Sequence, residues 1–188
     1  MIIGLHGNKR AGKDTAYEFI KSAYPDAVRL AFADKIKESL AALFGVSIRE
    51  INTLKEEKGV FKIQSESFQH SYTWRSFAQR YGTEAHRDIF GEDFWVDMIL
   101  PKEPDSIPDD ELLIVTDVRF KNEAERIKHL GGYIIYINRL NLLNNDSHIS
   151  EERLSDEYFS YIINNNASLD QFKERVLEVV SQLVIPHK

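Results

Sequence analysis

The 188-residue chain contains no cysteine, which excludes disulfide bonds, thiolate metal sites and cysteine nucleophiles. Long hydrophobic runs are also missing. No segment approaches a membrane span, and the apolar run at residues 1–5 is too short for a secretion signal. Positive charge is not in excess either, since 24 Lys and Arg residues stand against 30 Asp and Glu residues. Extended nucleic-acid binding needs a dense positive stripe. We therefore expect a cytoplasmic protein with neither a nucleic-acid nor a membrane partner.

The chain does contain an alternation of short apolar runs and amphipathic helical patterns. Strands are predicted at 1–6, 27–30, 112–117, 133–137 and 161–163. Helices are predicted at 13–23, 33–44, 73–81, 93–100, 121–130 and 169–184, whereas 55–72, 101–110 and 140–157 read as polar or irregular. Such alternation implies right-handed crossovers between parallel strands. The sequence thus predicts an α/β fold, a three-layer sandwich with a central parallel sheet in one domain.

The stretch GNKRAGKDT directly follows the first predicted strand and opens the first predicted helix. Its Gly7, Gly12 and Lys13 match the GxxxxGK pattern of phosphate-binding loops, in the structural context that the pattern requires. Glycines let successive backbone N–H groups turn towards an anion, and the helix N-terminus adds a favourable dipole. Lys13 can then reach the β- and γ-phosphates of a nucleotide. The alternative is a tight strand–helix turn with an exposed lysine.

Two aspartates near this loop are candidate magnesium ligands. Asp14 stands where phosphate-binding loops usually have a Ser or Thr hydroxyl, and a carboxylate is an equally hard oxygen ligand. Thr15, one residue later, can offer its hydroxyl to the α-phosphate. Asp117 ends the run LLIVTD, at the carboxyl end of a predicted parallel strand, where a second Mg²⁺ contact belongs. Both have simpler alternatives: Asp14 as a favourable first-turn helix residue, and Asp117 as a helix cap.

Five strings spread over nearly the whole chain carry a family resemblance. GNKRAGKDT, FADKIKESL, WRSFAQRYGTE, IVTDVRFKNEAERIKHLGG and NNDSHISEE together resemble the phage-type deoxynucleoside monophosphate kinases of the P-loop kinase superfamily. The resemblance implies a single P-loop kinase domain over 1–188, with an acceptor-binding insertion at 33–100 and a lid-like loop at 140–157. It also implies transfer of the ATP γ-phosphate, with Mg²⁺, to a deoxynucleoside 5′-monophosphate, and a homodimer in the cytoplasm of a host cell. The segment 50–72 is shorter than the corresponding segment of the phage enzymes. Because this segment belongs to the acceptor-binding region, the selectivity for the base of the acceptor stays open.

The resemblance also implies roles for individual residues. The ATP-binding set is Asn8, Arg10, Ala11, Gly12, Lys13, Asp14, Thr15 and Arg139. The acceptor-binding set is Lys9, Lys37, Arg75, Trp95, Asp117, Arg119 and Glu123. Catalysis would rest on Lys13, Arg10, Asp117 and Arg119, and Mg²⁺ would be held by Asp14 and Asp117. Glu123, four residues after Arg119 on a predicted helix, can pair with it or remain solvated. His148 lies within the resemblance, but no role follows for it.

The chemistry of such a transfer agrees with these residue types. A phosphate monoester is already an anionic nucleophile at neutral pH, so the reaction needs converging positive charge and no general base. Two other functions remain open. One is a kinase for another small phosphorylated acceptor, such as phosphomevalonate, which an aromatic residue such as Trp95 facing the acceptor would disfavour. The other is a nucleotide-switched binding protein, which would hydrolyse ATP slowly without any dependence on an acceptor.

Overall fold

The computed structural model describes residues 1–56, 60–65, 68–140 and 154–184. The chain divides into two compact units. Unit 1 comprises Met1–Phe32 and Ile99–Lys188, and unit 2 comprises Ala33–Met98. Within the described ranges, no helix is both long and apolar enough to cross a membrane.

Unit 1 is built on a five-stranded sheet in which every neighbouring pair of strands is parallel. Its strands are β1 (Ile2–His6), β2 (Val28–Leu30), β5 (Leu113–Val118), β6 (Tyr133–Asn138) and β7 (Tyr161–Asn164). They are arranged in the order β2-β5-β1-β6-β7. The central strand β1 is buried along its whole length, as expected for a parallel strand covered on both faces. All five predicted strands are confirmed, although β5 runs one residue past Asp117.

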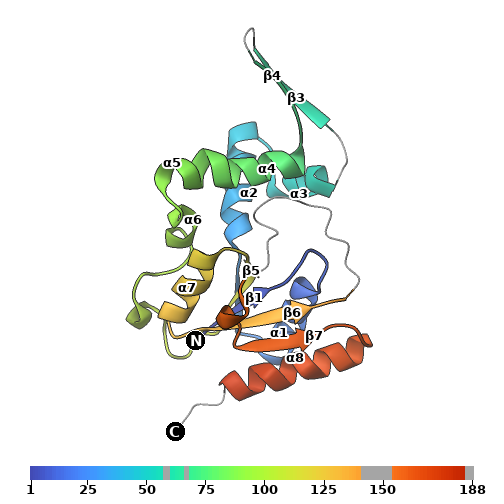
Figure 1. Ribbon diagram of the computed structural model, residues 1–188, viewed down its shortest axis with the longest axis vertical. Helices are drawn as coiled ribbons and strands as arrows, with labels where there is room; N and C mark the ends of the chain where they lie inside the picture. Colours follow the sequence, from blue (N-terminus) through green and yellow to red (C-terminus); the bar gives the residue numbers. More distant parts are fainter. Residues whose placement is uncertain (57–59, 66–67, 141–153, 185–188) are drawn as a thin grey trace. The chain divides into compact units, whose positions relative to one another are not determined.

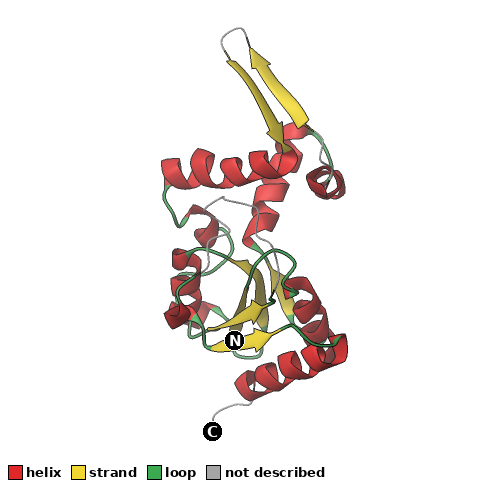
Figure 2. Cartoon of the chain, turned by 45° about the vertical axis from the view of Figure 1, so that its right-hand side comes forward, coloured by secondary structure: helices red, strands yellow, loops and turns green. Residues whose placement is uncertain are grey.

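Helices cover both faces of this sheet (Figures 1 and 2). Ile3 and Leu5 of β1 share one buried cluster with Ile20 of α1 (Lys13–Ala23) and Phe172 of α8 (Leu169–Val184). On the opposite face, α7 (Lys121–His129) lies so close that a Cβ on Gly4 would stand 2.8 Å from the Cδ1 atom of Ile127. Alternate residues of one strand therefore face different helices. The predicted three-layer α/β sandwich is confirmed.

Two short 3₁₀ helices complete the described part of unit 1, η2 (Pro104–Ser106) and η4 (Asp156–Tyr158). The predicted lid-like loop at 140–157 falls mostly on residues 141–153, which lie outside the described residues, as does His148.

Unit 2 is mainly helical, and its described elements follow one another closely along the chain. They are α2 (Phe32–Phe44, whose first residue belongs to unit 1), α3 (Ile48–Glu56), β3 (Val60–Ser65), β4 (Phe68–Thr73), α4 (Trp74–Gly82), the π-helical turn η1 (Thr83–Arg87), α5 (Asp88–Phe90) and α6 (Phe94–Asp97). Strands β3 and β4 form an antiparallel pair. A small apolar core joins the helices through Leu40, Ile51 and Ala78.

Two predictions for this unit were wrong. Residues 55–72 are not irregular, because they contain the end of α3 and the pair β3–β4, whose backbones run in register from Val60 opposite Thr73 to Ser65 opposite Phe68. The helix predicted at 93–100 is only the four residues of α6. Pro101 follows Leu100, and a proline disfavours helical backbone in the residue before it. Helical backbone is therefore disfavoured at Leu100, at the C-terminal end of the predicted helix.

Candidate functional site

The loop between β1 and α1 depends on its two glycines. A Cβ on Gly7 would stand 2.5 Å from the carbonyl oxygen of Ile137 on β6, and Gly7 has a φ of 150°. Gly12 has a φ of 110°, in the region that favours glycine, and precedes α1 as its N-cap. Between them, the backbone N–H of Ala11 donates to the carbonyl of Asn8 at 3.0 Å, and Arg10 has a φ of 66°. The loop is therefore a tight turn in which a side chain at position 7 or 12 would be strained.

Lys13 closes this loop from the first turn of α1. Its Nζ donates to the carbonyl oxygens of Gly7 at 2.5 Å and Asn8 at 3.0 Å. The ammonium group is thereby held against the loop, close to the N-terminus of α1. Gly12 has no side chain with which to cap that terminus. Uncapped N–H groups, a helix dipole and a cation together favour an anion at this point.

A cavity of about 340 Å³ opens beside the loop. Its walls include six of the residues assigned to ATP: Arg10, Gly12, Lys13, Asp14, Thr15 and Arg139. The remaining wall comes from residues that the sequence reasoning missed: Asn165, Ala167, Leu169 and Phe172, in the β7–α8 connection and in α8. Asn8 and Ala11 belong to the loop without lining the cavity. A volume of this size is in the range of small-molecule sites.

Asparagine side chains connect the walls of this cavity. The Nδ2 group of Asn165 donates to the carbonyl of Ala11 at 2.8 Å, and its backbone N–H donates to the carbonyl of Asn138 at 2.7 Å. The Oδ1 atom of Asn166 accepts from the backbone N–H of Leu140 at 2.7 Å. The phosphate loop, the end of β6 and the β7–α8 connection are therefore bonded to one another. The sequence signal for these contacts was a run of three asparagines, 164–166, at the end of a strand.

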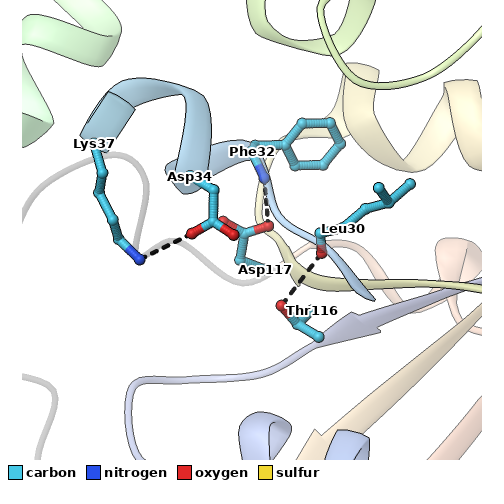
Figure 3. Close-up of polar contacts among 6 residues, drawn as sticks. All are labelled: Leu30, Phe32, Asp34, Lys37, Thr116 and Asp117. Carbon is cyan, nitrogen blue, oxygen red and sulfur yellow. Dashed lines mark hydrogen bonds and ion pairs between the residues drawn. The ribbon is translucent and has the colours of Figure 1, made fainter. Parts of the chain in front are cut away.

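At the end of β5, the candidate residues lie next to the start of the phosphate loop. His6 is paired with Val118, so Gly7 and Arg119 leave the sheet from adjacent positions on neighbouring strands. Asp117 uses its Oδ1 atom to accept a hydrogen bond of 2.8 Å from the backbone N–H of Phe32 (Figure 3). Asp117 therefore caps the start of α2, and the helix-cap alternative raised from the sequence is correct. A contact between Asp117 and Mg²⁺ stays a prediction.

Glu123 supports the turn that carries Arg119. Its side chain is buried, with a relative exposure of 2%. Its Oε2 atom accepts from the backbone N–H groups of Arg119 at 2.7 Å and Phe120 at 3.0 Å. Glu123 is therefore not solvated, and the hydrogen bond runs from the backbone of Arg119, so a pairing of the two side chains stays a prediction. A carboxylate in this position caps the first turn of α7.

The remaining candidates belong to unit 2, apart from Lys9, which is exposed in the phosphate loop. Lys37 forms an ion pair of 2.9 Å with Asp34, one turn earlier on α2 (Figure 3). Arg75 stands in the first turn of α4, which Thr73 caps. Trp95 is 3% exposed, and its Nε1–H donates to the carbonyl of Gly82 at 2.8 Å. Its indole is thus buried and bonded to the end of α4, and the predicted acceptor contact stays a prediction.

Comparison with known proteins places these features in a family. The family model for deoxynucleotide monophosphate kinase matches residues 46–176. A protein of Acanthamoeba polyphaga mimivirus that is assigned to the same kinases is 29% identical, over 96% of both chains. The deoxynucleotide monophosphate kinase of Enterobacteria phage T4 is 25% identical, over 97% of this chain and 99% of its own. A solved dephospho-CoA kinase from Campylobacter jejuni aligns with 97% of this chain and 96% of its own, with a TM-score of 0.45 and 14% identity. The chain belongs to the deoxynucleotide monophosphate kinase family.

Proposed function

We propose that this chain transfers the γ-phosphate of ATP to a deoxynucleoside 5′-monophosphate, giving ADP and the deoxynucleoside diphosphate. One observation carries the donor half of this proposal: a single cavity is lined by the phosphate loop on one side and by Arg139 and the β7–α8 connection on another. The family supports the acceptor half.

On the donor side, the triphosphate follows the loop and the N-terminus of α1. Lys13 turns its ammonium from the carbonyls of Gly7 and Asn8 towards the β- and γ-phosphates, and Arg10 and Arg139 add charge from the cavity wall. Thr15 offers its hydroxyl to the α-phosphate. Asn8, Ala11 and Gly12 contribute through the backbone of the loop. The apolar wall formed by Leu169 and Phe172 is suited to the base.

The oxygen ligands around this loop fit Mg²⁺. Asp14 is exposed and shares the cavity wall with the hydroxyl of Thr15. Across the described residues there is no group of three or more His, Cys, Asp or Glu side chains able to hold a metal. Mg²⁺ commonly needs no such group, because it binds through one or two carboxylates and the substrate phosphates. When bound, the ion would supply charge neutralisation between the reacting phosphates. Asp14 and Asp117 are the carboxylates that we assign to it.

On the acceptor side, we assign recognition of the monophosphate to Arg119, Lys9, Lys37 and Arg75. A guanidinium grips two phosphate oxygens at once, which favours Arg119 and Arg75 for this role. Trp95 and Glu123 complete the set as supports. The segment 33–100, which contains unit 2, is the acceptor-binding insertion of this proposal, and 140–157 is its lid.

The chain's own contribution to the reaction is then positioning and positive charge. The acceptor phosphate is its own nucleophile, so no side chain has to remove a proton. Lys13, Arg10 and Arg119 stabilise charge that develops on the transferring group and on its neighbours. Asp117, through the cap on Phe32, fixes the start of α2.

An ADP-release assay over a panel of acceptors tests the proposal. The panel contains the deoxynucleoside monophosphates, the matching ribonucleotides, phosphomevalonate and a sample without acceptor. We expect ADP release that depends on at least one deoxynucleoside monophosphate. Release that is unchanged without acceptor would indicate an ATPase, and release only with phosphomevalonate would indicate the other kinase. The cytoplasmic location and the homodimer are further predictions, the second of which light scattering in solution tests.

A further inference from the structure

Asn165 occupies an unusual position between the phosphate loop and the rest of unit 1. Its side-chain Nδ2 donates to the carbonyl of Ala11, a residue that is only 1% exposed, while its backbone N–H donates to Asn138 at the end of β6. A Cβ on Gly12 would stand 2.6 Å from this same Nδ2 atom. The side chain of Asn165 therefore fills the space that the glycine leaves open.

The bond to Ala11 fixes the orientation of a peptide group in the loop. A trans peptide is planar, so the carbonyl of Ala11 and the N–H of Gly12 point in opposite directions. By holding the carbonyl, Asn165 holds the N–H of Gly12 turned away from the β7–α8 connection. Arg10, one residue before Ala11, has a φ of 66°, a conformation that is unfavourable for a residue with a side chain. A loop with such a residue relaxes easily unless other contacts constrain it.

We propose that Asn165 is a positioning residue that holds the phosphate loop in its nucleotide-binding conformation, acting through the carbonyl of Ala11. This inference rests on the proposed function, since it assigns the loop to the phosphates of ATP. This role differs from a contact with the base, although Asn165 lines the same cavity as Leu169. In the proposed role, Asn165 affects the binding of the polyphosphate part of ATP and needs no contact with the base.

Binding of two probes distinguishes these roles. Isothermal titration would compare ATP with inorganic tripolyphosphate, which has no base and no ribose, on the wild-type chain and on Asn165→Ala. The variant leaves the buried carbonyl of Ala11 without its donor and adds no charge. We expect affinity for both probes to fall by about 5- to 150-fold, the range for an unsatisfied buried polar group. The matched control is Asn164→Ala, which removes an exposed side-chain hydrogen bond with Asn138 rather than the bond to the loop and should leave tripolyphosphate binding unchanged.

Kinetics supply a second readout. Asn165→Ala should raise KM for ATP and leave KM for the monophosphate unchanged. Its melting temperature should lie below that of Asn164→Ala, because the buried carbonyl of Ala11 loses its donor. A loss confined to ATP, with tripolyphosphate unaffected, would overturn the proposal in favour of a base contact. Equal loss in both asparagine variants, or no loss in either, would also overturn it. If Asn165→Ala folds poorly, Asn165→Ser removes the same donor, since its hydroxyl is too short to reach Ala11.

Probe binding and the ADP-release assay together separate this inference from the proposed function. A wild-type chain that binds both probes but phosphorylates no monophosphate refutes the proposed function, while the comparison of variants still decides the role of Asn165. A wild-type chain that binds neither probe overturns both.

Discussion

Replacing Lys13 by methionine tests the phosphate loop most specifically. Methionine keeps the length of the apolar stem and removes the ammonium group, which in the structure donates to Gly7 and Asn8. Two consequences follow: the loop loses a cation that holds its carbonyls, and the transferring phosphate loses a charge-stabilising donor. The first affects stability and the second affects the reaction rate.

The two effects differ in size. Loss of hydrogen bonds from a partly buried charged group should lower the free energy of unfolding by about 1–3 kcal/mol. For a chain of this length that corresponds to a fall of roughly 2–4 °C in melting temperature per kcal/mol. Loss of a donor aimed at developing charge costs about 10²–10³-fold in kcat. The rate effect should therefore far exceed the effect on the folded fraction at 25 °C.

Lys21→Met provides the matched control. Lys21 lies on the same helix and donates from its ammonium to the carbonyl of Ala27 at 2.9 Å, at the other end of α1. Its loss should lower the melting temperature by a similar order and leave kcat unchanged. The measurements are thermal unfolding and steady-state rates at saturating ATP and acceptor. A folded Lys13→Met variant with the kcat of Lys21→Met would refute the assignment of the loop to the transferring phosphate.

Three further substitutions have distinct expected outcomes. Asp14→Asn should raise the Mg²⁺ concentration for half-maximal rate at fixed ATP, because it removes one charge facing the ion; an unchanged Mg²⁺ titration would leave Asp14 as a helix-start residue. Arg119→Lys keeps the positive charge but loses the planar guanidinium that can bind two phosphate oxygens at once. In steady-state kinetics, kcat/KM for the monophosphate should fall by about 10- to 150-fold, while kcat/KM for ATP is unchanged. A fall for ATP without a fall for the monophosphate would move Arg119 to the donor side. Asp117→Asn keeps a side-chain oxygen that can accept from the backbone N–H of Phe32. The melting temperature should therefore change little, while the Mg²⁺ concentration needed for half-maximal rate rises. A large fall in melting temperature with an unchanged Mg²⁺ titration would make Asp117 purely structural.

The sheet and the phosphate loop could be predicted because their signals are local. The run from Leu112 to Val115 is apolar throughout, which is typical of a parallel strand buried on both faces, and the glycines of the loop stand at fixed spacing from Lys13. Both patterns can be recognised in the local sequence before any packing partner is known. The structure confirms both elements.

One missed element had a readable signal. Helix α3 starts after Ser47, whose hydroxyl and backbone N–H contact the carboxylate of Glu50 at 2.7 and 2.8 Å. Ser-x-x-Glu is a capping box, and Ile48 and Ile51 follow it at helical spacing. The pair β3–β4 had a weaker signal. Phe61 and Ile63 alternate with polar residues in the first strand, and Phe68 and Tyr72 lie at even spacing in the second, but both runs are short.

The asparagine contacts could not be predicted from one sequence. Asn165 bonds to Ala11 across 154 residues, and nothing in the local pattern indicates which side chain will meet that carbonyl. Asp117 shows the same limit, because its partner is the backbone of Phe32, 85 residues earlier. In both cases the sequence shows a polar residue at the end of a strand, whereas its hydrogen-bond partner is known only from the fold.

Transfer of a radiolabelled γ-phosphate tests the central claim most directly. Labelled ATP would be incubated with the wild-type chain, Mg²⁺ and each deoxynucleoside monophosphate in turn, and the products separated by chromatography. We expect label in a deoxynucleoside diphosphate, formed about 10²–10³-fold more slowly when Lys13→Met replaces the wild-type chain. Label found only in inorganic phosphate, at a rate that the monophosphate does not change, would contradict it.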